Sequence, residues 1–148
     1  MEVQAEGAGR AKRDPSLGEL QVVTGVPVAI GEDVEPLLEF VRPALALYIG
    51  GMGARGKNFY NTLCRQYGYE EEAEKIQDLY LGGNKRDAEA VVPLELLEMC
   101  NLVGPEGYVK ERIEAFRESG VTNLQVVPAP ADGGDPAATI RQLKEWVA

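Results

Sequence analysis

The residues with the clearest chemical potential lie in the glycine-rich stretch LYIGGMGARGKNFYN, residues 47–61. Gly51, Gly53 and Gly56 have the G-x-G-x-x-G spacing that brings backbone N–H groups close to a dinucleotide pyrophosphate. Gly51, Gly56 and Lys57 also fit G-x-x-x-x-G-K, the loop that wraps around nucleotide phosphates. A nucleotide-binding loop is therefore the first hypothesis for this stretch.

Three features of the sequence argue against that hypothesis. The residues before the glycines have the apolar spacing of a helix, whereas a phosphate-binding loop follows a strand. Asn58 stands where the phosphate loop needs Ser or Thr for magnesium. No acidic residue closes a second strand within about 20 residues of the glycines. We therefore interpret residues 47–53 as a helix end followed by a turn, with no bound phosphate.

The other reactive side chains give weaker signals. The acidic residues 70–72 and 74 suit a solvated helix start better than a metal site. Cys64 and Cys100 match no metal or redox spacing, and we expect reduced thiols in partly buried helices. The sequence contains no histidine, so an imidazole base would have to come from another chain.

Five tyrosines gather in sequence around the glycine-rich stretch. Packing between short helices explains such a cluster, and the alternative is the wall of a pocket for a flat ligand. The five are Tyr48, Tyr60, Tyr67, Tyr69 and Tyr80.

Composition limits the class of protein. The 148 residues suit one domain, and 45% hydrophobic with 26% charged residues is ordinary for a globular protein. A net charge of −9 and scattered basic residues argue against a nucleic-acid partner. No apolar run approaches the roughly 20 residues of a membrane span, and the polar N-terminus has no signal core. We expect a cytoplasmic protein with no membrane partner.

Two segments have strand character, and helical spacing dominates elsewhere. Residues 20–30 and 121–127 are rich in Val and apolar at most positions, which is typical of strands covered on both faces. Pro27 should fray or bulge the first strand, and Pro43 should kink a helix over residues 34–48. Further helices are expected at 59–67, 70–81, 84–92, 94–100, 105–120 and 136–147, after a loose lead-in at 1–17 with a helix remnant at 5–12.

This order of elements fits a parallel crossover with a long helical excursion between its two strands. Two strands do not make a sheet, however, and both are expected to be buried on two faces. Either another part of a domain covers them or the chain pairs with itself. The sequence therefore predicts a single partial domain, residues 1–148, that is a piece of a larger α/β domain.

Three long stretches carry a family resemblance: LQVVTGVPVAIGEDVEPLLEFVRPALALYIGGMGARGKNFYN, YGYEEEAEKIQDLYLGGNKRDAEAVVPLELLEMCNLVGP and YVKERIEAFRESGVTNLQVVP. They resemble the C-terminal part of luciferase-like flavin or deazaflavin oxidoreductases, the type that uses coenzyme F420 above all. The resemblance implies an α/β fold, the C-terminal fragment of a (β/α)8 TIM barrel. Residues 20–30 would be its seventh strand and 121–127 its eighth, and the helices between them an insertion that roofs the active site and contributes to dimer contacts.

The function that this resemblance implies is hydride transfer between coenzyme F420, or alternatively flavin mononucleotide, and a small organic substrate. The family's early strands supply most of the cofactor site and the usual catalytic histidine or acid, and none of them is in this sequence. We therefore assign no catalytic, cofactor-binding or metal-binding residue. Sites in barrels lie at the C-terminal strand ends, which here are residues 30–33 and 127–130. We expect the glycine-rich stretch to reach over this mouth, so the substrate-side candidates are Met52, Lys57, Asn58 and Tyr60. For Lys57, a solvated surface lysine is the alternative.

Two other functions stay open at this stage. One is a non-catalytic remnant that binds a partner, or forms a homo-oligomer, through uncovered strand faces. The other, less favoured, is a nucleotide-binding protein. For the chain alone we expect neither tight deazaflavin binding nor turnover, because two strands cannot close a barrel mouth.

Overall fold

The computed structural model describes Asp14, Ser16 and residues 18–130 and 133–147. The helix remnant expected at residues 5–12 lies outside these ranges. No helix within them is long and apolar enough to cross a bilayer. The elements follow in the order β1 (Val23–Ile30), η2 (Glu35–Phe40), α2 (Arg42–Ala46), η3 (Leu47–Gly51), α3 (Phe59–Gln66), α4 (Glu70–Leu81), α5 (Lys85–Val91), α6 (Leu94–Met99), β2 (Leu102–Gly104), α7 (Glu106–Glu118), β3 (Asn123–Pro128) and α8 (Pro136–Val147).

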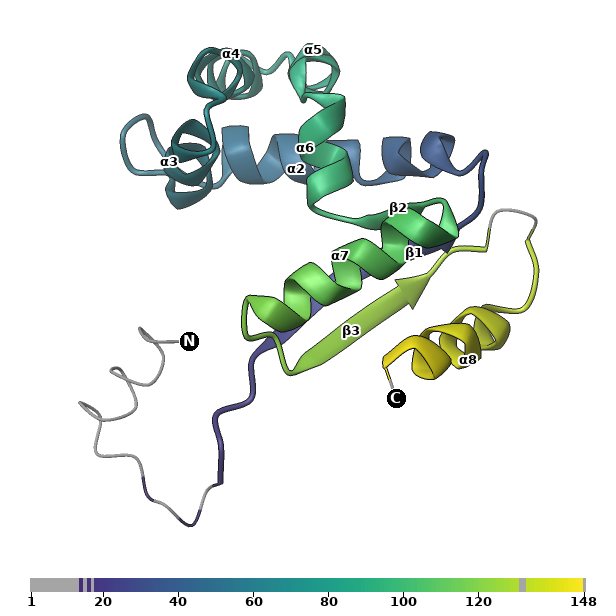
Figure 1. The fold of residues 1–148 in the computed structure, drawn as a ribbon. Helices are drawn as coiled ribbons and strands as arrows, with labels where there is room; N and C mark the ends of the chain where they lie inside the picture. The colour runs from purple at the N-terminus through teal and green to yellow at the C-terminus, as the bar shows by residue number, and fades with distance from the viewer. Residues whose placement is uncertain (1–13, 15, 17, 131–132, 148) are drawn as a thin grey trace.

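A parallel sheet of three strands, in the order β2-β1-β3, lies between helices η2 to α6 and helices α7 and α8 (Figure 1). β1 pairs with β3 from Val23 opposite Asn123 to Val28 opposite Pro128. The predicted pair of parallel neighbours is therefore confirmed. β2 was not predicted, because three residues directly before a helix are too few to show a strand pattern.

β1 runs through Pro27 without the predicted fray or bulge. Ala129 donates to the carbonyl of Val28 in the direction of β3, whereas Gly31 donates to Gly104 in the direction of β2. Backbone groups of alternate residues thus point to opposite neighbours, and Pro27 belongs to the set that points to β2. Pairing with β2 begins only at Val28, so the missing N–H of Pro27 leaves no ladder bond unmade.

The helix predicted over residues 34–48 consists of three consecutive segments. η2 is a 3-10 helix, α2 is an α-helix, and η3 is a π-helical turn. Pro36 and Pro43 each stand in the first turn of a segment, where a missing N–H costs nothing. Pro43 therefore starts α2 instead of kinking one long helix. The predicted helix end followed by a turn at residues 47–53 is confirmed, with η3 continuing through Gly51.

Helices cover both faces of the sheet, and each face has its own core (Figure 1). Val28 of β1 packs in one core with Ile113 of α7 and Leu143 of α8. Side chains alternate along a strand, so Ala29 points the other way. It packs with Val103 of β2 and with the helices η2 to α6, which we call the insertion. The sheet therefore positions the insertion over one face and α7 and α8 over the other.

The insertion covers only part of its face of the sheet. Val23 of β1 is 57% exposed and Val127 of β3 is 63% exposed. β3 alternates exposed and half-buried residues, so the prediction that both strands are buried on two faces is wrong for β3. Helices α7 and α8 cover one side of β3, and the other side is open to solvent.

Candidate functional site

An apolar cavity of about 360 Å³ lies between β1 and the insertion. Gly25 and Pro27 of β1 form one wall, and α2, η3, α3 and α6 contribute the others. Almost every side chain around it is aliphatic or aromatic. The lining residues are Gly25, Pro27, Val41, Ala44, Leu45, Tyr48, Ile49, Tyr60, Leu63, Cys64, Tyr67, Leu96, Cys100 and Asn101.

The five tyrosines predicted as a cluster separate into two groups. Tyr48 and Tyr60 lie with their ring centroids 4.7 Å apart, and Tyr67 lines the cavity with them. Tyr69 and Tyr80 instead pack against the core of the insertion. Packing between helices is thus confirmed for two of the rings, whereas the other three form a wall of the cavity.

The glycines before α3 serve close packing. A Cβ on Gly50 would lie 2.5 Å from Cβ of Tyr80, and a Cβ on Gly51 would lie 2.5 Å from Cε1 of the same side chain. A Cβ on Gly53 would lie 2.8 Å from the carbonyl oxygen of Lys57. Side chains cannot approach other atoms so closely, so helix packing and a tight turn require these glycines. Gly56 instead has a φ of +74°, which favours glycine, so the glycine spacing is explained without a phosphate.

Asn58 holds this turn against η3. Its side chain is 2% exposed, and its Nδ2 donates to the carbonyl oxygens of Tyr48 and Ile49 at 3.0 and 2.9 Å. Its Oδ1 accepts from the backbone N–H of Asn61 at 3.2 Å and so caps the first turn of α3. The amide of Asn58 is therefore committed to the fold.

The structure does not gather the four substrate-side candidates around one cavity. Tyr60 lines the apolar cavity, whereas Asn58 borders a polar one. Met52 and Lys57 are exposed and lie outside the lining of the apolar cavity. Sequence reasoning missed the wall that β1 provides. The available signal was a glycine within the predicted strand, at Gly25, which often marks the close approach of a ligand or another backbone.

The polar cavity, of about 410 Å³, lies between the turn and helices α3 and α4. Arg55 pairs with Asp78 at 2.7 Å, and Arg65 lies 3.9 Å from Glu74. Buried Asn61 donates from its Nδ2 to main-chain oxygens of η3 and α4. Each arginine faces a carboxylate of its own, so this cavity lacks the excess positive charge that a phosphate would need.

Both cysteines line the apolar cavity. Cys64 is buried in α3, and burial, with a smaller contribution from Glu72, raises the pKa of its thiol to about 11. Cys100 follows α6 and is exposed, so the predicted partly buried helical site is wrong for this residue. Desolvation nevertheless raises the pKa of the Cys100 thiol. Both groups are protonated thiols near neutral pH, and thiols are weak nucleophiles.

The carboxyl ends of β1 and β3 border a further cavity, of about 390 Å³, beside the start of α8. Asp135 stands at this place and accepts from the backbone N–H of Ala137 at 2.9 Å. It also pairs with Arg141 at 3.0 Å. The backbone hydrogen bond first, and Arg141 second, hold the pKa of Asp135 below its usual range. The N-terminus of α8 already has its anion, which disfavours a phosphate there.

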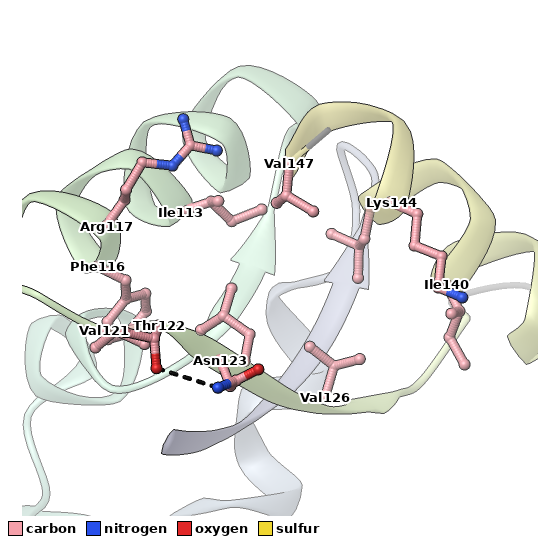
Figure 2. Close-up of a pocket in the computed structure, with 12 residues that line it drawn as sticks. Ile113, Phe116, Arg117, Val121, Thr122, Asn123, Val126, Ile140, Lys144 and Val147 are labelled. Carbon is pink, nitrogen blue, oxygen red and sulfur yellow. Dashed lines mark hydrogen bonds between the residues drawn. The ribbon is translucent and has the colours of Figure 1, made fainter. Parts of the chain in front are cut away.

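A cavity of about 520 Å³ lies on the opposite face of the sheet, between α7 and α8 and over β3 (Figure 2). Phe116 of α7 and Ile140 of α8 line it, and Thr122 and Asn123 mark its edge. The last two residues stand at the beginning of β3. In barrel enzymes that end of the strands serves stability, and catalysis occurs at the other end.

Acidic residues do not form a metal site in the part of the chain that the structure describes. No group of three or more His, Cys, Asp or Glu side chains there could hold an ion. Glu70, Glu71 and Glu72 occupy the first turn of α4, where carboxylates interact favourably with the helix dipole.

Comparisons with known proteins identify what the chain resembles. The sequence profile described as luciferase-like monooxygenase matches residues 2–123. A protein of Mycobacterium tuberculosis named "Putative coenzyme F420-dependent oxidoreductase Rv3520c" is 29% identical over 127 residues, which are 86% of this chain and 37% of that protein.

A solved structure shows the same fold. The coenzyme F420-dependent tetrahydromethanopterin reductase of Methanopyrus kandleri superposes with a TM-score of 0.62 and 24% identity, over 93% of this chain and 37% of that one. The fold is therefore α/β, with a parallel sheet that corresponds to part of a TIM-barrel-like structure, as predicted. The chain spans little more than a third of the length of the relatives that it matches.

Proposed function

The chain belongs to the luciferase-like monooxygenase family, and from this premise we propose that it forms the C-terminal part of an oxidoreductase that transfers a hydride between coenzyme F420 and an organic substrate. Its relative in M. tuberculosis carries the name of a coenzyme F420-dependent oxidoreductase, which supports this coenzyme over flavin mononucleotide. The observation that carries the assignment of a role is the apolar cavity between β1 and the insertion.

The described residues do not fit the whole coenzyme. Coenzyme F420 combines a flat deazaflavin ring with a phosphate and a carboxylate tail. The apolar cavity offers no cation to these anions. In the polar cavity each arginine is paired with a carboxylate. At the strand ends, the negatively charged Asp135 lines the cavity. We therefore assign binding of the coenzyme mainly to other parts of the barrel, as the resemblance implies.

The contribution of this chain is the substrate side of the site. When bound, the coenzyme supplies or accepts the hydride. The insertion extends from the carboxyl end of β1 and folds over the sheet (Figure 1), where it forms the apolar cavity above β1. Tyr48, Tyr60 and Tyr67 on one side of the cavity, and the wall formed by Gly25 and Pro27, orient the substrate. Orientation of the substrate is an effect that a hydride transfer needs from its protein.

A chimera tests this proposal. The M. tuberculosis relative is cut before the segment that aligns with this chain, and the chain is joined in its place. We expect the chimera to bind coenzyme F420 with saturable quenching of the coenzyme fluorescence. The isolated chain and the isolated N-terminal portion should each bind far more weakly, because neither forms a closed barrel.

Two results would contradict the proposal. A folded chimera that does not bind the coenzyme would show that the chain cannot complete the barrel. Saturable, micromolar binding by the isolated chain would show that its own residues hold the coenzyme after all. The circular dichroism spectrum of each protein establishes that it is folded before titration.

One observation supports a second function, that of a self-associating module without catalysis. Val23 and Val127 expose apolar side chains on the uncovered part of the sheet, and an exposed strand face favours association with another chain. In this case the chain would form stable homo-oligomers, and the chimera would gain no coenzyme binding from it.

A further inference from the structure

We propose that the apolar cavity between β1 and the insertion binds the substrate, and that this substrate is an uncharged, largely apolar molecule with a flat ring. Assigning the molecule as the substrate rests on the proposed oxidoreductase function. The cavity itself, and the chemistry of its occupant, are inferred from the lining residues alone. The inference can therefore fail or hold separately from the function.

The lining determines the charge of the occupant. Among the described residues, those around the cavity include no Asp, Glu, Lys, Arg or His, although 26% of the whole sequence is charged. A charged group moved into such surroundings loses its hydration and finds no partner. The walls therefore select against carboxylates, phosphates and ammonium groups. Charged side chains instead line the cavities of about 410 and 390 Å³.

The aromatic wall determines the shape of the occupant. Tyr48 and Tyr60 form a tilted pair, and both remain about two-fifths exposed, at 42% and 40%. Tyr67, also at the cavity, is 55% exposed. Three partly exposed rings at one apolar cavity offer stacked and edge contacts to a planar molecule, and each hydroxyl can still reach water or a polar substituent.

Gly25 provides an independent sign that the space is kept open. Glycine in the interior of a strand costs stability, and no positive φ requires it at this position. A Cβ on Gly25 would have only the carbonyl oxygen of Gln125 within 4 Å, at 3.9 Å. Packing therefore does not demand glycine here, in contrast to Gly50 and Gly51. The missing side chain enlarges the cavity, which suits the close approach of a ligand.

Two fluorescent probes test the proposal on the full chain. N-phenyl-1-naphthylamine is neutral, and 8-anilinonaphthalene-1-sulfonate has the same ring system with one sulfonate added. We expect saturable binding of the neutral probe and at least about tenfold weaker binding of the anionic probe. Equal affinity for both probes, or tighter binding of the anionic one, would overturn the inference about charge.

Matched variants locate the bound probe. Gly25→Leu should fill the cavity and weaken binding of the neutral probe by about tenfold or more, whereas Gly107→Leu, on the open surface of α7, should not. Tyr60→Ala should weaken it several-fold, whereas Phe40→Ala, at an exposed aromatic side chain outside the lining, should have little effect. Tyr60→Ala keeps the test decisive if Gly25→Leu does not fold. Binding that is insensitive to Tyr60→Ala would place the probe elsewhere and contradict the proposal.

Cys100 gives a readout that does not depend on fluorescence. It lines the cavity and is exposed, so the neutral probe at saturation should slow its alkylation by N-ethylmaleimide, followed by mass spectrometry. An unchanged rate would count against occupancy of this cavity. These results are distinct from those of the chimera: coenzyme binding by the chimera without probe binding would leave the function standing and remove the substrate assignment.

Discussion

At the scale of single residues, Asn58 has the largest expected structural role among the four substrate-side candidates. It makes three hydrogen bonds from a position that is 2% exposed. Asn58→Ala should lower the free energy of unfolding by about 2–3 kcal/mol. The carbonyl of Tyr48 and the N–H of Asn61 lose the Asn58 side chain as a partner, whereas the carbonyl of Ile49 keeps its bond from Asn61. Urea denaturation measures this change.

Asn84 supplies the control for that experiment. It also stands at the N-cap of a helix, α5, but its side chain makes no capping bond and is exposed. Asn84→Ala should change the free energy of unfolding by less than about 0.5 kcal/mol. Equal effects of the two substitutions would show that Asn58 does not hold the turn.

Cys64 makes stability depend on pH in the alkaline range. The unfolded thiol releases its proton near the ordinary pKa of 9.0, whereas the folded thiol retains it up to about 11. Between these values the unfolded state binds fewer protons, so the free energy of unfolding falls as the pH rises. Comparison of the wild type with Cys64→Ala by urea denaturation should show that the wild type loses about 2 kcal/mol more stability between pH 8 and pH 11 than the variant does. Cys100→Ala removes only the contribution of the Cys100 thiol, whose pKa desolvation also raises, and should keep the part of the loss that comes from Cys64. A Cys64→Ala protein that loses as much stability as the wild type would exclude Cys64 as a source.

The sequence predicted residue types at the site better than residue roles. Tyr60 was placed on the substrate side, and the structure puts it on the wall of the apolar cavity. Asn58 has a side chain that suits a ligand or a backbone carbonyl equally, and only the fold decides which of them it meets. The position of Gly25 in the wall could not be predicted, because it depends on how the insertion folds back over β1.

At the scale of elements, Arg42 connects two helices that are far apart in sequence. Its side chain is only 16% exposed, pairs with Glu39 at 2.8 Å, and donates to the carbonyl oxygens of Glu89 and Val92 at the end of α5. Arg42→Leu should reduce the free energy of unfolding by about 2 kcal/mol, because these buried acceptors lose a charged donor. Hydrogen exchange followed by mass spectrometry should show faster exchange in α5.

Arg55 offers the matched control at the surface. It pairs with Asp78 at 2.7 Å, but its side chain is 63% exposed, and exposed ion pairs contribute about 1 kcal/mol or less. Arg55→Leu should therefore leave exchange in α5 unchanged. Faster exchange in both variants would mean that α5 responds to general destabilisation and not to the loss of Arg42.

Helices were predictable because the residues whose apolar spacing indicates a helix are also the residues that pack into the core. α4 begins and ends where its spacing predicts, and Ala73 and Ile76 are buried on its inner face. β2 was not predictable, since its three residues form a strand only by pairing with the end of β1. The division of residues 34–48 into three segments follows from prolines that begin helical turns and from the close packing of Gly50 on Tyr80.

At the scale of the whole molecule, the sequence predicted a parallel pair of strands that lack a complete sheet, and the fold agrees. The structure adds that the two faces are unequal. α7 and α8 cover one face over both long strands, while the insertion leaves Val23 and Val127 exposed on the other. No periodicity in the sequence distinguishes these two faces, because both carry valines.

The open face leads to a prediction about assembly. Val127 is 63% exposed on β3, and among the described residues β3 pairs with β1 alone, so that its outer edge is unpaired. Burial of such a face stabilises association by about 25 cal/mol per Å² of apolar area. Sedimentation velocity should therefore show concentration-dependent self-association of the 16.1 kDa chain.

A charge on the open face should prevent that association. Val127→Lys places an ammonium group where a second strand or sheet would dock, and charged residues on exposed strands block such pairing. Phe40→Lys is the control, because Phe40 is 79% exposed on η2 and lies outside the sheet. We expect Val127→Lys to sediment as a monomer and Phe40→Lys to associate like the wild type.

A wild type that is monomeric at all concentrations would mean that the insertion and α7 and α8 together form a sufficient core. Equal dissociation of both variants would assign the contact to general surface hydrophobicity, whereas loss of association in Val127→Lys alone would locate it on the strand face that a complete barrel encloses.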